Sequence, residues 1–342
     1  YALPAAALSG RRMDRQRPDR RIGNLFENIC SIENLLIADI KAGKGKSGAY
    51  GVIRHRQNQS SNLLQLHDLL MSGKFTTSEY KIFRIYDPKE RDIYRLPYYP
   101  DRIVHHAIMN YLEPIFVSVF TKDTYSCIKG RGIHAVIINL KYSLKNARNT
   151  QYCLKFDIRK FYPSIDHEIL KNIIRRKIKD IRLSNLLDNI IDSAPGVPIG
   201  NYLSQYFANL YLAYFDHWIK ENKKVKYYFR YADDIVILHE SKEYLHDLFF
   251  DIQNYLWDNL RLIIKGNWQV FPVKSRGIDF VGYVFYHTHT KLRKGIKKRF
   301  CKKVSKLNKQ SLSDKNYKQA ISPWLGWAKH CNSKHLLKKL KL

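Results

Sequence analysis

Hydrophobic and polar positions along the chain follow two periods, and each period predicts one kind of secondary structure. Apolar residues recur every three or four positions, the spacing of one helical face, across residues 25–36, 63–71, 101–115, 133–144, 166–178, 181–193, 204–221 and 243–259. Short apolar runs bounded by turn-forming residues predict strands at 82–86, 95–99, 153–158, 227–230, 235–238 and 278–285. Because strands and helices interleave, the pattern predicts an α+β or α/β core.

The composition changes near both ends of the sequence. Residues 1–20 are Arg-rich and are left out of the predicted fold, since a solvated basic tail and an arm that contacts RNA both fit them. After about residue 291 Lys and Arg dominate, and Phe300, Val304 and Leu307 form a narrow apolar stripe on a basic helix. This stripe predicts a separate helical subdomain.

The net charge narrows the class of partner. The 342 residues carry 60 Lys and Arg against 30 Asp and Glu, a formal charge of +30. Such an excess repels itself in a folded protein unless a polyanion offsets it, so nucleic acid and an anionic membrane surface are the candidate partners. No apolar run approaches the roughly 20 residues that span a bilayer. The five scattered cysteines favour a reducing compartment, which predicts a cytoplasmic protein.

Three carboxylates carry the strongest chemical signal. Asp233 and Asp234 lie between the apolar runs 227–230 and 235–238, which predicts a hairpin with both residues at its tip. A solvated Asp pair in a turn is the simple alternative. However, apolar strands on both sides predict burial, and two buried anions side by side are costly without a cation. Asp157 ends another apolar strand, so strand ends of one sheet could bring all three together.

The carboxylates predict a two-metal phosphoryl-transfer site. Oxygen ligands suit Mg²⁺, and Mn²⁺ could substitute for it. Two ions about 3.5–4 Å apart can activate an attacking 3′-hydroxyl and stabilise a leaving pyrophosphate. Phosphoryl transfer then asks the protein mainly for positioning.

These residues resemble the motifs of the reverse transcriptase family. Tyr231-Ala232-Asp233-Asp234 matches its YxDD box, and Asp157 followed by Tyr162 matches its first-aspartate motif. The resemblance spans about residues 25–335. It implies a right-hand polymerase, with fingers and palm (an antiparallel sheet plus helices) over 21–290 and a basic helical thumb over 291–342. It also implies that the catalytic and metal-binding set is Asp157, Asp233 and Asp234, with Ile158 among the metal ligands.

The resemblance further implies a nucleotide-binding set. Lys89 and Arg91 match fingers positions that meet the triphosphate, and Arg131 is a candidate of the same kind. Tyr162 matches the aromatic that lies under the sugar and blocks ribonucleotides. Surface charges and a core aromatic are the alternative interpretations of these side chains. The remaining expected residues are Ile199, Gly200, Gln205 and Lys265.

The segment 196–205 indicates the subfamily. Retroviral and group II intron enzymes carry Gln after its Pro, where this chain has Ile199. The pattern Ile199-Gly200 with Ser204-Gln205 resembles reverse transcriptases of diversity-generating retroelements, as do the segments 268–270, 275–283 and 326–330. The resemblance implies dNTPs, a template RNA copied with errors at adenine, and an RNA or DNA primer. It also implies a small basic helical accessory protein, expected to be oligomeric.

The basic helix of the expected thumb is predicted to grip the template–primer duplex through its phosphates, although a solvated helix is the alternative. Its candidate residues are Lys297, Lys298, Arg299, Lys302, Lys303 and Lys306.

Three other functions compete with this interpretation. A retron or phage-defence reverse transcriptase of ordinary fidelity would share Asp157, Asp233 and Asp234. A non-enzymatic nucleic-acid-binding module would be expected to lack part of that carboxylate set, which is complete here. A membrane-surface protein would concentrate its charge on one amphipathic helix, whereas basic residues occur along the whole chain.

Overall fold

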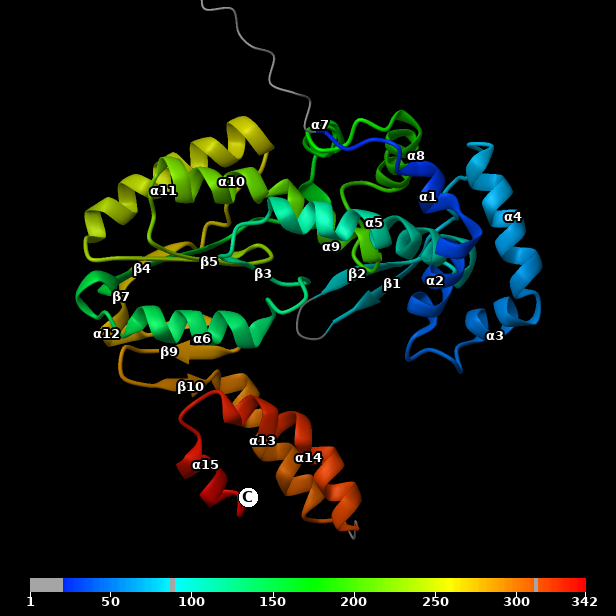
Figure 1. The fold of residues 1–342 in the computed structure, drawn as a ribbon. Coiled ribbons are helices and arrows are strands. Elements are labelled where there is room, and N and C mark those ends of the chain that lie inside the picture. The colour runs from blue at the N-terminus through cyan, green and yellow to red at the C-terminus, as the bar shows by residue number, and fades with distance from the viewer. Residues whose placement is uncertain (1–20, 87–89, 311–312) are drawn as a thin grey trace, which may run out of the picture.

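The computed structural model describes residues 21–86, 90–310 and 313–342, and Figure 1 shows them as layers of helices around a sheet. The N-terminal third is helical apart from one antiparallel hairpin, whose strands pair from Lys81 with Arg95 to Ile85 with Arg91. Its elements are α1 (Phe26–Cys30), α2 (Ile32–Gly43), α3 (Tyr50–Gln57), α4 (Gln59–Met71), β1 (Lys81–Ile85), β2 (Arg91–Arg95) and α5 (Ile103–Val119).

A five-stranded sheet in the order β3-β5-β6-β4-β7 forms the middle layer. Strand β4 lies between β6 and β7 and is antiparallel to both, while β3 runs parallel to β5. The strands are β3 (Thr124–Tyr125), β4 (Tyr152–Asp157), β5 (Tyr227–Tyr231), β6 (Asp234–His239) and β7 (Gln269–Pro272).

Helices cover both faces of this sheet. One face carries α9 (Tyr202–Tyr211), α10 (Ala213–His217) and α11 (Lys242–Leu260), next to α7 (His167–Arg175) and α8 (Ile181–Asp192). The other face carries α6 (Ile133–Leu144) and a second, three-stranded sheet. That sheet and the C-terminal helices comprise α12 (Val273–Arg276), β8 (Ile278–Phe280), β9 (Tyr283–Phe285), β10 (Thr290–Leu292), α13 (Lys294–Leu307), α14 (Asp314–Lys329) and α15 (Lys334–Lys339).

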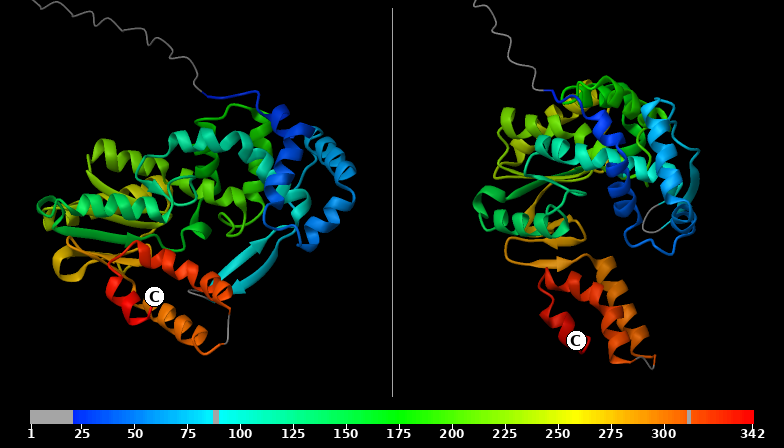
Figure 2. Two further views of the ribbon diagram at one scale, coloured as in Figure 1. Left: turned by 60° about the horizontal axis from the view of Figure 1, so that its bottom comes forward. Right: turned by 45° about the vertical axis from the view of Figure 1, so that its right-hand side comes forward.

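Two hydrophobic cores follow from the alternation of side chains along the central strands. On β5, Tyr228 joins the core shared with α5 and α9–α11, whereas its neighbour Phe229 joins the core shared with α6 and β8–β10. The second core continues into α13 through Phe300 and Val304. It therefore crosses the boundary expected near residue 290, and the turned view in Figure 2 shows α13–α15 following directly from that sheet.

Several helices begin where a side chain can cap the free backbone N–H groups. Asp166 accepts from Ile169 N at 3.0 Å, and Ser241 accepts from Tyr244 N at 3.0 Å. Asp180 caps α8 and also accepts from Leu25 N at 2.8 Å, so one carboxylate joins the N-terminal helices to α8.

Most predicted elements are confirmed, but four are wrong in a specific way. The helical face predicted at 25–36 is divided at Ser31 into α1 and α2. The returning strand of the first hairpin is Arg91–Arg95, not 95–99, because a π-helical turn (Tyr98–Arg102) begins just beyond it. The helix predicted at 204–221 is divided into α9, α10 and a π-helical turn (Trp218–Asn222). The strand predicted at 278–285 is a hairpin that turns at Val281 and Gly282, both with positive φ. Residues 87–89, which include the expected triphosphate residue Lys89, lie outside the described residues, as does the tail 1–20.

Within the described residues, every helix falls short of the length and apolarity needed to cross a membrane.

Candidate active site

Two adjacent strands bring the predicted carboxylates together. Strand β4 pairs with β6 in a register that sets Asp157 directly opposite Asp234, and β5 pairs with β6 so that Tyr231 is opposite Asp234. Ala232 and Asp233 are the two residues of the turn between them. The prediction that Asp157 and the Asp233–Asp234 hairpin lie on neighbouring antiparallel strands is therefore confirmed.

The site is electrostatically strained, as anions packed together must be. Burial, together with the Asp157 carboxylate, raises the pKa of Asp233. Burial also raises the pKa of Asp234 to about 6, although the ammonium of Lys155 acts in the opposite direction. Lys265 Nζ lies 2.6 Å from Asp157 Oδ2, and Lys155 Nζ lies 3.5 Å from Asp234 Oδ1. Each outer carboxylate thus has a lysine beside it.

The residues fit a divalent cation site. Among the described residues, Asp157 Oδ1 and Asp234 Oδ1 are buried oxygens without a hydrogen-bond partner. Such orphaned acceptors are costly unless a cation meets them. No set of three or more His, Cys, Asp or Glu side chains in the described ranges is gathered tightly enough to hold a metal as it stands. As the structure stands, the ammonium groups of Lys265 and Lys155 supply the positive charge beside Asp157 and Asp234.

An open hollow of about 480 Å³ adjoins Asp157 and Asp234. Its lining combines the cations Lys155, Arg276 and Arg293 with Asp157, Asp234 and Asp279. Arg293 is paired with Asp279 at 2.6 Å. Sequence analysis missed these cations, although Lys155 stands out as a charged position within an apolar strand.

The hydroxyl of Tyr162 lies within electrostatic range of Asp233 and Arg91. Burial raises its pKa, with Cys127 and Asp233 adding to the effect and Arg230 and Arg91 opposing it. Lys89 lies outside the described residues.

The segment 196–205 joins this region to the β1–β2 hairpin. Val197 N donates to Tyr162 O at 2.9 Å, and Tyr94 N donates to Ile199 O at 2.8 Å. Gly200 has φ +122°, and a Cβ there would lie 2.6 Å from Tyr94 O. Only glycine fits so close to the β2 backbone. Ile199 is half-buried and Gly200 exposed.

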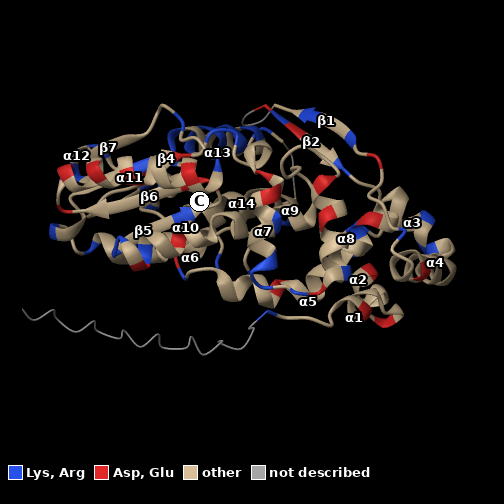
Figure 3. Ribbon diagram, turned by 90° about the horizontal axis from the view of Figure 1, so that it is seen from above, with Lys and Arg blue, Asp and Glu red and all other residues tan. Residues whose placement is uncertain are grey.

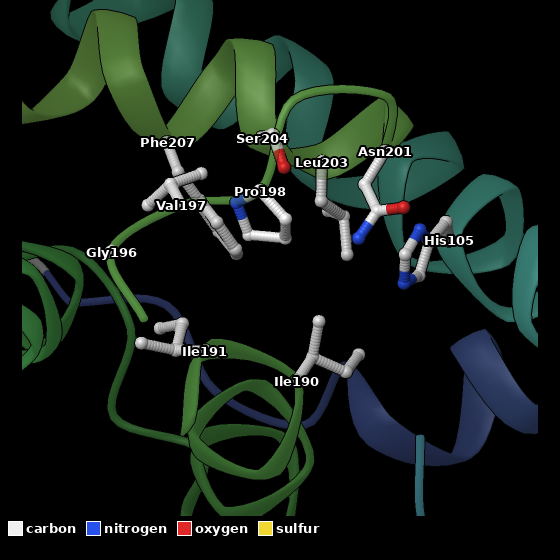
Figure 4. Close-up of a pocket in the computed structure, with 10 residues that line it drawn as sticks. All are labelled: His105, Ile190, Ile191, Gly196, Val197, Pro198, Asn201, Leu203, Ser204 and Phe207. Atoms are coloured by element: carbon white, nitrogen blue, oxygen red, sulfur yellow. The ribbon is translucent and has the colours of Figure 1, made fainter. Parts of the chain in front are cut away.

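A small pocket borders this segment, and Figure 4 shows its lining from α5, α8, α9 and the segment itself. Its walls are mainly apolar, and burial lowers the pKa of His105 to about 3, which keeps the imidazole neutral. We regard the cavity as part of the packing that seats the segment.

The remaining predicted residues lie in different surroundings. Arg131 Nη1 donates to Thr121 O at 2.9 Å, so its guanidinium supports a backbone turn. Ile158 is fully buried and its backbone forms a bridge with Ile264. Lys265 is the expected nucleotide-binding residue that pairs with Asp157.

A second, cationic hollow of about 200 Å³ lies next to Gly200 and Gln205. Its lining includes Lys46, Arg102 and His106 and contains no carboxylate. Burial is the largest cause of a lowered pKa for each of the three groups. Arg102 also lowers the pKa of Lys46, and Lys46 and Arg102 help to lower that of His106 to about 4, which leaves its imidazole neutral near pH 7. They come from a loop, a π-helical turn and α5, so no local pattern along the chain marks the cluster.

Helix α13 carries the predicted basic surface. Its buried face is Ile296, Phe300, Val304 and Leu307, which confirms the apolar stripe and extends it by one residue. Lys303 is half-buried, and the other predicted cations are exposed: Lys297, Lys298, Arg299, Lys302 and Lys306. Figure 3 shows Lys and Arg gathered along this helix.

The central sheet is antiparallel apart from β3, and three carboxylates lie where β4 meets the β5–β6 turn. Together with the helices on its faces and the terminal helical unit, this arrangement defines a right-hand polymerase. The family model described as "Reverse transcriptase (RNA-dependent DNA polymerase)" matches residues 88–285. The chain belongs to the reverse transcriptase family and contains its RNA-dependent DNA polymerase domain.

Two curated proteins show how far the sequence similarity of this chain to other proteins extends. Protein YkfC of Escherichia coli is 24% identical over 266 residues, which cover 64% of this chain and 69% of that protein. Group II intron-encoded protein LtrA of Lactococcus lactis is 27% identical over 139 residues, or 37% of this chain and 23% of LtrA. The match thus spans less than a quarter of the intron-encoded relative.

A similar solved structure is the telomerase of Candida tropicalis in complex with a fragment of telomeric RNA. It has a TM-score of 0.47 and 13% sequence identity, and the match covers 83% of this chain and 58% of that one.

Proposed function

We propose that the chain is an RNA-directed DNA polymerase that extends an RNA or DNA primer with dNTPs on a template RNA. The observation that carries this proposal is the pairing of Asp157 with Asp234 beside the Asp233 turn, with a buried oxygen of each strand residue left without a hydrogen-bond partner. Asp157, Asp233 and Asp234 would hold two Mg²⁺ ions, or Mn²⁺ in their place. When bound, these ions supply activation of the 3′-hydroxyl and charge stabilisation at the leaving pyrophosphate.

The protein's own contribution is positioning and charge. Tyr162, next to Asp233, would bear against the sugar of the incoming nucleotide, and Arg91 would meet its phosphates. Lys265 and Lys155 offset the carboxylate charge before the ions arrive. Once displaced, either ammonium would be available to the triphosphate.

Two basic surfaces would hold the nucleic acid. The hollow lined by Lys46, Arg102 and His106 would receive phosphates of the template strand, because Lys46 and Arg102 line it without a carboxylate to offset their charge. Helix α13 would contact the duplex behind the primer end. We propose the division into fingers and palm (21–290) and thumb (291–342) on the same grounds.

We further propose that the enzyme serves a diversity-generating retroelement in the cytoplasm. It would make adenine-mutagenised cDNA with a small basic accessory protein. Support for this comes from Ile199 and the Ser204-Gln205 pattern. The second candidate is another bacterial reverse transcriptase of ordinary fidelity, and the similarity to YkfC and to an intron-encoded protein favours it. Sequencing of cDNA made on a defined RNA separates the two, because only the first predicts errors concentrated at template adenines.

Substitution of the carboxylates tests the polymerase itself. We expect Asp157→Ala or Asp233→Ala to abolish cDNA synthesis while template–primer affinity stays within about twofold, because phosphate contacts elsewhere carry affinity. Asp258→Ala, at an exposed position on α11, is the matched control. Primer extension and a binding titration measure the two quantities. Near wild-type extension by either variant would show that the two-metal assignment is wrong.

A further inference from the structure

Arg230 is a charged residue in the interior, three positions before Asp233. Its side chain is the largest, by residue volume, among the fully buried side chains of the described residues. A guanidinium cannot lose its proton there, so its N–H groups need acceptors.

Asp216, on α10, neutralises this charge. Arg230 Nε donates to Asp216 Oδ1 at 2.7 Å, and Nη2 donates to Oδ2 at 2.6 Å, a two-pronged pair with both side chains at 0% exposure. Tyr228 Oη donates to Oδ1 at 2.6 Å and Thr124 Oγ1 to Oδ2 at 2.7 Å. Each carboxylate oxygen therefore has two donors, and the pair is held in one geometry.

The third nitrogen of Arg230 reaches the catalytic turn. Nη1 donates to Ala232 O at 3.1 Å, and also to Asn209 Oδ1 on α9 at 3.1 Å. The Ala232 carbonyl belongs to the peptide that joins Ala232 to Asp233. Ala232 has φ +54°, a conformation that side-chain-bearing residues rarely adopt. The hydrogen bond thus fixes a strained peptide one bond from a proposed metal ligand.

The network also includes the backbone after β3. Asn209 Nδ2 donates to Ser126 O at 3.0 Å. Asn209 therefore links Arg230 and the catalytic turn to the loop that follows β3.

We propose that Arg230 is a positioning residue: anchored by Asp216, it holds the Ala232–Asp233 peptide so that Asp233 and Asp234 face Asp157 at the spacing two cations require. This rests on the proposed polymerase function. The competing account is that the buried pair serves only the stability of the core. The two accounts differ in what happens when the pair is removed without leaving an unpaired charge.

The variants separate positioning from stability. Arg230→Met with Asp216→Leu removes both charges together, and Arg230→Lys keeps the charge but lacks the planar fork. Thr124→Val and Tyr228→Phe each remove one donor to Asp216 and leave the Arg230–Ala232 contact in place. For every variant, we would measure the thermal midpoint, the template–primer Kd, and the single-turnover extension rate over a range of Mg²⁺ concentrations.

We expect the double variant and Arg230→Lys to bind template–primer within about twofold of wild type yet extend about 100-fold more slowly, the scale of a 1 Å misplacement. They should also need more Mg²⁺ for half-maximal rate. Thr124→Val and Tyr228→Phe should lower the thermal midpoint but keep the rate within about threefold.

A folded double variant, or Arg230→Lys if the double variant does not fold, that extends at near wild-type rate would overturn the proposal. So would a rate that follows the thermal midpoint across all variants. Wild-type protein and Asp157→Ala are run alongside. If wild type does not extend a primer, the polymerase function itself fails; if it does, the outcome concerns Arg230 alone.

Discussion

At the scale of single residues, Ile199 and Gly200 show how one segment joins two parts of the site. The Ile199 carbonyl accepts from Tyr94 N, and Gly200 lies too close to the same strand for any side chain. The backbone of this segment is therefore fixed by β2, while the Ile199 side chain stays half-buried. A substitution at Ile199 can change the chemistry of the side chain without moving the backbone.

Ile199→Gln should raise fidelity opposite template adenine. An amide can hydrogen-bond beside the nascent base pair, and a polar restraint of about 1 kcal/mol changes discrimination about fivefold. Total activity should fall, because a half-buried amide must find partners in a pocket shaped for an aliphatic chain.

Sequencing of cDNA made by both proteins on one RNA measures this effect, with the accessory protein added if synthesis needs it. Ile199→Leu is the matched control, since it keeps an aliphatic side chain of the same size. An unchanged adenine error spectrum in Ile199→Gln would mean that Ile199 contributes packing only.

At the scale of elements, the spacing of apolar residues and the turn-forming residues between apolar runs were enough to predict β4, the β5–β6 hairpin and most long helices. They were enough for the carboxylate cluster as well, because Asp157, Asp233 and Asp234 all lie at strand ends. Local patterns failed where tertiary contacts decide. Val281 and Gly282 continue an apolar run in the sequence, but the chain folds back there and Gly282 packs against Trp327 with no room for a Cβ.

Clusters that draw on distant elements could not be predicted. Lys46, Arg102 and His106 meet only because a loop, a π-helical turn and α5 pack together. Arg230 is one polar position in an apolar strand, and its partner Asp216 lies on a helix of a different layer. Neither position carries a spacing that identifies its partner.

Helix α13 should bind several phosphates of the template–primer duplex. We expect Lys297→Gln, Lys298→Gln and Lys302→Gln together to weaken template–primer binding and to reduce the slope of log affinity against log salt by about one for each phosphate that the helix no longer neutralises. All three are exposed, so folding should be unaffected. Lys315→Gln with Lys318→Gln on α14 tests whether loss of charge alone has the same effect. An unchanged slope in the triple variant would exclude α13 from the nucleic-acid interface.

At the scale of the whole molecule, the palm and the C-terminal helices share one interior. The second core contains Cys153 and Val236 from the central sheet, Phe280 and Phe285 from β8–β9, and Phe300 from α13. Side chains from β4 and α13 are therefore buried in the same hydrophobic core, although more than a hundred residues separate the two elements in the sequence. The proposed thumb is a functional division of the chain built on a continuous core, which should keep its helices in a fixed relation to the carboxylates.

Because the core is continuous, a destabilising substitution in the proposed thumb should also lower the stability of the central sheet. Phe300 is fully buried and stacks on Trp324, so Phe300→Ala should lower the free energy of unfolding by about 3–5 kcal/mol. Because the core is shared, amide hydrogens of β6 should exchange faster in this variant, and unfolding should remain a single transition. Phe250→Ala, at a side chain that is 59% exposed on α11, provides the comparison and should leave both quantities nearly unchanged. If β6 exchange were unaltered while α13 and α14 lost protection, the thumb would unfold on its own, and residues 291–342 would be a separate domain in the energetic sense as well.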